Sequence, residues 1–166
     1  MLDIYVDADA CPVKSEIYRV AQRFGLSVTL VSNTAMRIPR EDWLRLVVVD
    51  GQADAADDWI AAHASTDDVV ISGDIPLAAR CLARGSTVLD LRGGTFSEEN
   101  IGEALASREL LSHLRDLGAV TGGPPAIGPR DRSRFLHRLD ESIRAIRRRH
   151  ETPRASGGAC DAPSST

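Results

Sequence analysis

Short apolar runs alternate with segments of helical spacing along the first 91 residues, and this alternation strongly constrains the fold. The runs predict strands over residues 2–6, 27–32, 44–49, 68–72 and 87–91. Helices are expected between them, over 12–24, 54–63 and 76–84. Strands that alternate with helices favour a mostly parallel sheet with helices on both faces. We therefore expect an α/β fold with a central sheet of about five strands.

The pattern changes after Gly93-Gly94, where two longer helical segments follow. Ser97 is placed to cap a helix that continues to about residue 117, and a Gly/Pro-rich loop over 118–129 separates it from a last helix over 130–149. We expect residues 1–150 to form one domain with a C-terminal helical extension. The segment 151–166 is rich in Pro, Ser, Gly and Ala, which predicts a disordered tail.

Composition excludes several classes of protein. The longest apolar runs fall far short of the roughly 20 residues that a membrane span needs, so no membrane partner is expected. The N-terminal residues lack the features of a secretory signal, and we expect a cytoplasmic protein. The three cysteines have neither disulfide-framework nor zinc-site spacing; they are Cys11, Cys81 and Cys160.

Charge is distributed unevenly around a net value of −4. Residues 130–150 hold eight arginines against three acidic residues, so an acidic body carries a basic last helix. One side of this helix is apolar, and the other carries Arg134, Arg138, Arg144 and Arg148. This arginine face is either an ordinary solvated surface or a contact for a nucleic acid, and the sequence leaves both open.

Acidic residues follow the expected strands, at the edge of a parallel sheet where ligands bind. They are Asp7 and Asp9 after the first strand, Asp50, Asp54 and Asp57 after the third, Asp74 after the fourth and Asp90 at the fifth. Several carboxylates at one edge repel one another unless a cation lies among them, and a hard divalent ion suits oxygen ligands. We therefore expect Mg²⁺ or Mn²⁺ there.

Helix capping is the competing interpretation for several of these acids. Asp9, Asp54 and Asp74 each precede an expected helix and could serve only as caps. Asp7 lies at the end of an apolar strand, where it has no capping role, and this favours a functional one. Three further acids are expected on the solvated surface: Asp58, Asp67 and Asp68.

Basic and glycine-containing loops supply candidates for phosphate binding. Arg37 follows the second strand and Arg92 the fifth, so either side chain could reach the acidic edge and clamp a phosphate. Thr121, Gly122 and Gly123 could offer backbone N–H groups to an anion, although such a loop is as often a plain connector.

Several stretches closely resemble the bacterial YaiI/YqxD family over about residues 1–148. They are Asp7-Ala8-Asp9-Ala10-Cys11-Pro12-Val13, Arg37-Ile38-Pro39, Asp54-Ala55-Ala56-Asp57, Gly73-Asp74-Ile75-Pro76-Leu77-Ala78-Ala79, Arg92-Gly93, Thr121-Gly122-Gly123-Pro124 and Arg130-Asp131-Arg132. That family has no established biochemical function. It is similar to the PIN-domain-like group, whose nucleases hold magnesium or manganese with acidic residues at strand ends. The resemblance implies a PIN-like three-layer fold.

The resemblance also implies a site. Asp7, Asp57 and Asp74 match the acids that hold the metal, and Asp9 or Asp54 would support these ligands or act as a general base. Together with the acidic strand ends, this predicts a metal-dependent phosphodiesterase that acts on RNA or another phosphate-bearing substrate.

Two alternatives remain open. Asp7-Ala8-Asp9, Ser32 or Thr34, and Gly73-Asp74 resemble motifs of haloacid-dehalogenase-like phosphatases, but the lysine expected near the last motifs is missing because Lys14 is the chain's only lysine. The second alternative is a non-catalytic module that binds RNA or a nucleotide through the arginine face.

Overall fold

The computed structural model describes residues 1–123 and 125–151, so nearly all of the tail expected over 151–166 lies outside the described residues. Its centre is a six-stranded sheet with the order β3-β2-β1-β4-β5-β6. The strands are β1 (Asp3–Asp7), β2 (Ser27–Ser32), β3 (Leu44–Val48), β4 (Val69–Ile71), β5 (Thr87–Leu89) and β6 (Thr95–Phe96). The helices are α1 (Lys14–Phe24), α2 (Ala55–His63), α3 (Ile75–Leu82), α4 (Glu98–Asp116) and α5 (Pro129–Glu151).

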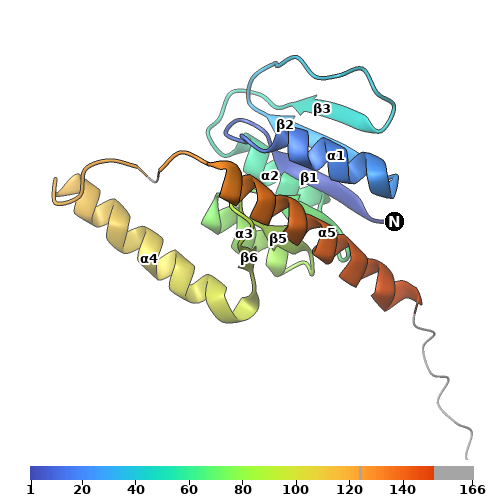
Figure 1. The fold of residues 1–166 in the computed structure, drawn as a ribbon. Coiled ribbons are helices and arrows are strands. Elements are labelled where there is room, and N and C mark those ends of the chain that lie inside the picture. Colours follow the sequence, from blue (N-terminus) through green and yellow to red (C-terminus); the bar gives the residue numbers. More distant parts are fainter. Residues whose placement is uncertain (124, 152–166) are drawn as a thin grey trace, which may run out of the picture.

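Two pairs of helices cover the two faces of the sheet, which gives three layers (Figure 1). Helices α1 and α5 pack on one face, where Ile17 of α1 and Phe135 of α5 lie in one buried cluster with Ile4 of β1. Helices α2 and α3 pack on the other face, where Ile60 and Leu77 are buried. The predicted α/β architecture with a C-terminal helical extension is confirmed.

The helices and strands differ from the sequence-based expectation in two main respects. The sheet has a sixth strand, β6, which pairs antiparallel with β5 after the Gly93-Gly94 turn and is too short to give a periodic signal. The first helix begins at Lys14 rather than Pro12, because Val13 occupies the N-cap position with a non-helical backbone (φ −108°, ψ 23°).

A buried carboxylate closes the turn between α2 and β4. Asp68 was expected on the solvated surface, and that expectation is wrong because its side chain is 3% exposed. It accepts hydrogen bonds from the backbone N–H of Asp3 (3.0 Å) and from both the N–H and hydroxyl of Ser65 (2.9 Å each). Asp67, also expected on the surface, is partly buried and pairs with His150 of α5. These acids therefore tie the turn to β1 and to α5.

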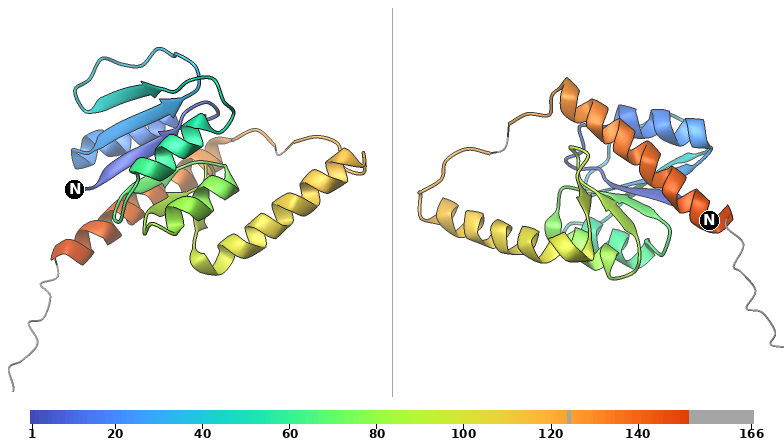
Figure 2. Two further views of the ribbon diagram at one scale, coloured as in Figure 1. Left: turned by 180° about the vertical axis from the view of Figure 1, so that it is seen from behind. Right: turned by 60° about the horizontal axis from the view of Figure 1, so that its bottom comes forward.

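Helix α4 projects from the body of the molecule and returns to α5 through a long loop (Figure 2). It packs against α3, but none of its residues is fully buried. The predicted cap is confirmed, because Ser97 and Asn100 form a reciprocal capping box at its start. Among the described residues, no helix combines the length and apolar character needed to cross a bilayer.

The turn between β5 and β6 fixes the position of α5. Gly93 has φ +85°, and a Cβ atom there would lie 2.8 Å from the backbone of Arg134 and Phe135. Asp90 holds the same turn, since its Oδ1 accepts the N–H groups of Arg92 and Gly94 (2.7 Å each). The turn and α5 are therefore in backbone contact.

We predict that Gly93→Ala destabilises the fold more than Gly118→Ala. Both glycines have positive φ, so each substitution carries a backbone strain of about 1–2 kcal/mol, but a Cβ at Gly118 meets no atom within 4 Å. Because the new Cβ would also collide with α5, Gly93→Ala should lower the free energy of unfolding by about 1–3 kcal/mol more than Gly118→Ala does. Urea unfolding of both variants measures the difference, and equal losses would show that the turn does not support α5.

Candidate functional site

The carboxyl ends of β1 and β4 lie side by side because the two strands pair in parallel. Asp7, the last residue of β1, accepts a hydrogen bond from the hydroxyl of Ser72 just after β4 (3.1 Å). Burial raises the pKa of the Asp7 carboxyl, and nearby Asp9 and Asp74 raise it further, while the Ser72 hydrogen bond opposes the shift.

Ser72 also reaches the next acidic residue. Its hydroxyl oxygen accepts the backbone N–H of Asp74 (2.9 Å), and its side chain is buried. Asp74 is the N-cap of α3, with Oδ1 accepting the N–H of Leu77 (2.9 Å). The capping interpretation is therefore correct for Asp74, but its second oxygen accepts no hydrogen bond from any described residue. Ser72 links Asp7 to Asp74, and its role was not predicted from the sequence.

Asp57 brings a third carboxylate to this edge from α2. Its pKa rises to about 6, first because of burial and then because Asp74, Asp7 and Asp54 lie near enough to repel its negative charge. Asp54 is exposed at the N-cap position of α2, but its side chain makes no capping hydrogen bond. The predicted acids Asp7, Asp54, Asp57 and Asp74 thus gather at one edge of the sheet.

Asp9 has a different environment. Its carboxylate accepts hydrogen bonds from the Ser32 hydroxyl and from both the backbone and side-chain nitrogens of Asn33. Although burial acts to raise its pKa, these hydrogen bonds lower it below the ordinary value. Asp9 caps no helix. It holds the turn after β2 and is close enough to Asp7 to raise the pKa of that carboxyl.

An open pocket of about 330 Å³ adjoins the gathered acids. Asp54, Asp57, Asp58, Asp74, Pro76, Leu77, Arg80 and Arg108 line it. Arg80 of α3 pairs with the exposed Asp58 (2.8 Å), whereas Arg108 comes from α4. Arg108 was not singled out from the sequence; the only signal is its helical spacing from Ile101 and Ala104, on the side of α4 that faces α3.

The donor chemistry of this edge fits a hard divalent cation. Across residues 1–123 and 125–151, no three His, Cys, Asp or Glu side chains form a preassembled metal site. Mg²⁺ usually keeps several waters and needs only one or two carboxylates, so a complete protein cage is not required. The free oxygen of Asp74 and the neighbouring carboxylates of Asp7 and Asp57 supply suitable ligands.

The predicted phosphate-binding residues lie outside the pocket lining. Arg37 is exposed in the loop after β2. Arg92 is paired with Asp131 at the start of α5 (2.9 Å) and donates to the carbonyl of Pro125. Thr121, Gly122 and Gly123 are exposed in the loop between α4 and α5. A role for these five residues in binding phosphate stays a prediction.

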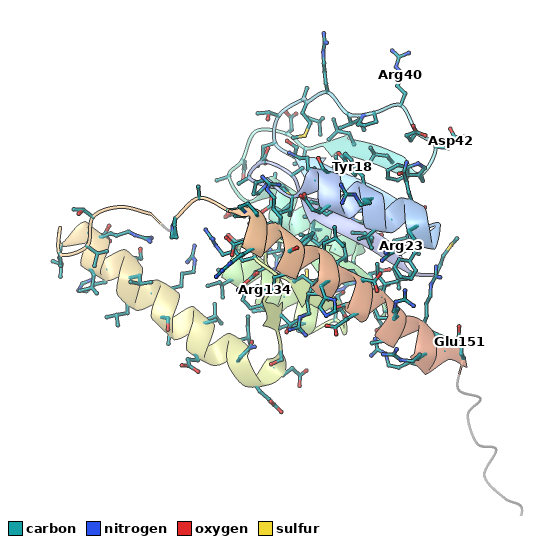
Figure 3. All side chains as sticks on the ribbon, in the orientation of Figure 1. Tyr18, Arg23, Arg40, Asp42, Arg134 and Glu151 are labelled. Atoms are coloured by element: carbon teal, nitrogen blue, oxygen red, sulfur yellow. The ribbon has the colours of Figure 1, made fainter. Side chains whose placement is uncertain are left out.

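Three arginine side chains of α5 contact α1, namely those of Arg132, Arg144 and Arg147. Arg23 lies in the last turn of α1 (Figure 3). It pairs with Asp140 of α5, which also pairs with Arg144. The guanidinium groups of Arg23, Arg144 and Arg147 lie 5.1–5.4 Å from the ring centre of Phe24. These contacts involve three of the eight arginines of α5, and binding of a nucleic acid to its arginine face stays a prediction.

We predict that Asp57→Asn flattens the pH dependence of stability in metal-free buffer. The pKa of Asp57 rises from 3.8 to about 6 on folding, so stability falls as the pH increases through this interval and the loss persists above it. The variant should be more stable than the wild type at neutral pH. Urea unfolding across this range is the measurement, with the exposed Asp58→Asn as control. Parallel curves for wild type and Asp57→Asn would contradict the charge repulsion.

Comparisons with known proteins identify relatives along most of the chain. The family model described as "Uncharacterized BCR, YaiI/YqxD family" matches residues 5–145. A "UPF0178 protein" of Rhodopseudomonas palustris (strain TIE-1) is 51% identical over 150 residues, which is 90% of this chain and 95% of the relative. A "UPF0178 protein" of Rhodospirillum rubrum is 47% identical over 148 residues, which is 89% of this chain and 99% of the relative. No solved structure matches. The chain belongs to the YaiI/YqxD family.

Proposed function

We propose that the protein is a Mg²⁺- or Mn²⁺-dependent phosphodiesterase that cleaves RNA. The observation that carries this proposal is the convergence of Asp7, Asp57 and Asp74 from three different elements on one edge of the sheet, where Asp57 is repelled by the other two carboxylates. Hydrolysis of a phosphodiester requires stabilisation of negative charge and an activated water, and carboxylates that hold a divalent ion serve both needs.

Asp7, Asp57 and Asp74 are the residues that would hold the ion. When bound, such an ion polarises a phosphate oxygen and lowers the pKa of a water. Ser72 orients two of the ligands through its hydroxyl, and α3 orients Asp74 through the capping hydrogen bond. Asp54 is exposed beside them without a capping hydrogen bond, which makes it the candidate to accept a proton from the attacking water.

The structure favours this function over a haloacid-dehalogenase-like phosphatase. That alternative uses a hydroxyl after the second strand to hold phosphate. Ser32 is fully buried and donates to Asp9, which leaves only the exposed Thr34 for that role. The one lysine, Lys14, is at the start of α1, where its charge helps to lower the pKa of Asp9, and it is not among the residues that line the acidic pocket.

We predict that removal of one carboxylate charge at this site raises the stability of the metal-free protein but reduces the further stabilisation by Mn²⁺. Asp7→Asn and Asp74→Asn should raise the melting temperature in the presence of chelator, because each removes a like charge, and Asn retains the ability to cap α3. Both should reduce the additional stabilisation that Mn²⁺ gives the wild type by binding the native state. Equal stabilisation of wild type and both variants by Mn²⁺ would show that these acids do not hold the metal.

The reaction itself distinguishes the candidate functions. Incubation with single-stranded RNA and Mn²⁺ should give internal cleavage that Asp7→Asn abolishes. A phosphatase would instead form a transient aspartyl phosphate on Asp7 from a phosphomonoester, and trapping that adduct would contradict the proposal. RNA binding without either reaction across several metals would identify a non-catalytic binding module.

A further inference from the structure

We propose that Arg108, on α4, binds a phosphate of the RNA substrate at the acidic pocket. This inference rests on the proposed function and assigns one of its substrate contacts to the helical extension. Arg108 lines the pocket together with Asp54, Asp57 and Asp74, although α4 follows these residues in the chain and projects from the body.

The way α4 packs directs Arg108 toward the pocket. Ile101 packs against the buried cluster beneath α2 and α3, and α4 is in contact with α3. Ile101, Ala104 and Arg108 follow one another at helical spacing, so they share the side of α4 that faces α3. Pro76, Leu77 and Arg80 line the same pocket from α3. Arg108 therefore occupies its position because of helix packing.

The guanidinium group of Arg108 forms no ion pair or hydrogen bond with any residue in the described part of the chain. Arg80, the other arginine of the pocket, pairs with Asp58, and Arg92 is held by Asp131. An arginine that lies beside several carboxylates without pairing keeps its planar set of N–H donors available for another acceptor. Phosphate, like carboxylate, can accept two parallel hydrogen bonds from these donors, and it is the group that an RNA substrate would bring.

The charge of the pocket explains when a phosphate would enter. Four carboxylates and two guanidinium groups line it, which leaves an excess of negative charge that repels an anion. One divalent cation on the carboxylates would neutralise this excess, and the arginine would then face an anion-binding site. The pocket volume of about 330 Å³ lies at the lower end of the range for small-ligand sites.

The test compares Arg108→Gln and Arg108→Lys with Arg115→Gln, a control that removes the same charge from the same helix outside the pocket lining. The probe is a short fluorescent single-stranded RNA with Mn²⁺. Every protein in the comparison also carries Asp54→Asn, which removes the proposed proton acceptor so that the RNA is bound without cleavage, and a gel checks that the RNA stays intact. Arg108→Gln should weaken binding about tenfold and reduce the slope of log affinity against log salt by about 0.7. Arg108→Lys should give an intermediate affinity, because it restores the charge without the paired donors.

Two further readouts separate this inference from the proposed function. Circular dichroism should show unchanged helix content in all variants, and Mn²⁺ should stabilise Arg108→Gln at least as much as the wild type. The inference would be overturned if Arg108→Gln and Arg115→Gln had the same RNA affinity and the same salt slope. The metal site would still stand in that case if Asp57→Asn lost Mn²⁺ binding. RNA binding that depends on Arg108 but not on Mn²⁺ would retain the phosphate contact and show that the phosphate enters without a cation on the carboxylates.

Discussion

Repulsion between carboxylates at one edge of the sheet is the constraint that the rest of the candidate site must offset. Parallel pairing of β1 with β4 places Asp7 beside the loop that carries Asp74, and α2 adds Asp57 from the neighbouring face. A sheet edge that served only stability would not gather like charges in this way, because carboxylates held close together repel one another. Such an arrangement is typical of sites that bind a cation.

Ordinary hydrogen bonds hold this unfavourable arrangement in place. The buried hydroxyl of Ser72 donates to Asp7 and accepts from the backbone of Asp74, and Asp74 caps α3. Asp9 is fixed by Ser32 and Asn33 at the neighbouring turn. The same side chains that stabilise local structure therefore orient the acids, so capping and metal binding are compatible roles for Asp74.

Sequence reasoning predicted the features that depend on local pattern. The alternation of strands and helices, the cap at Ser97 and the gathering of acids follow from hydrophobic spacing and from parallel topology. Burial of Asp68 was missed because one of its partners, Asp3, is 65 residues away in the chain. Arg108 was missed because its place at the pocket depends on how α4 packs against α3, which helical spacing alone does not specify.

In the proposed function, the acids on this edge hold a divalent cation. Diffraction from crystals soaked with Mn²⁺ can locate this ion by its anomalous signal, without any assumption about activity. We expect a strong anomalous peak between the carboxylates of Asp7, Asp57 and Asp74, and no such peak in crystals of Asp57→Asn soaked in the same way. A peak elsewhere, or an edge that stays free of Mn²⁺ in the wild type, would contradict that proposal.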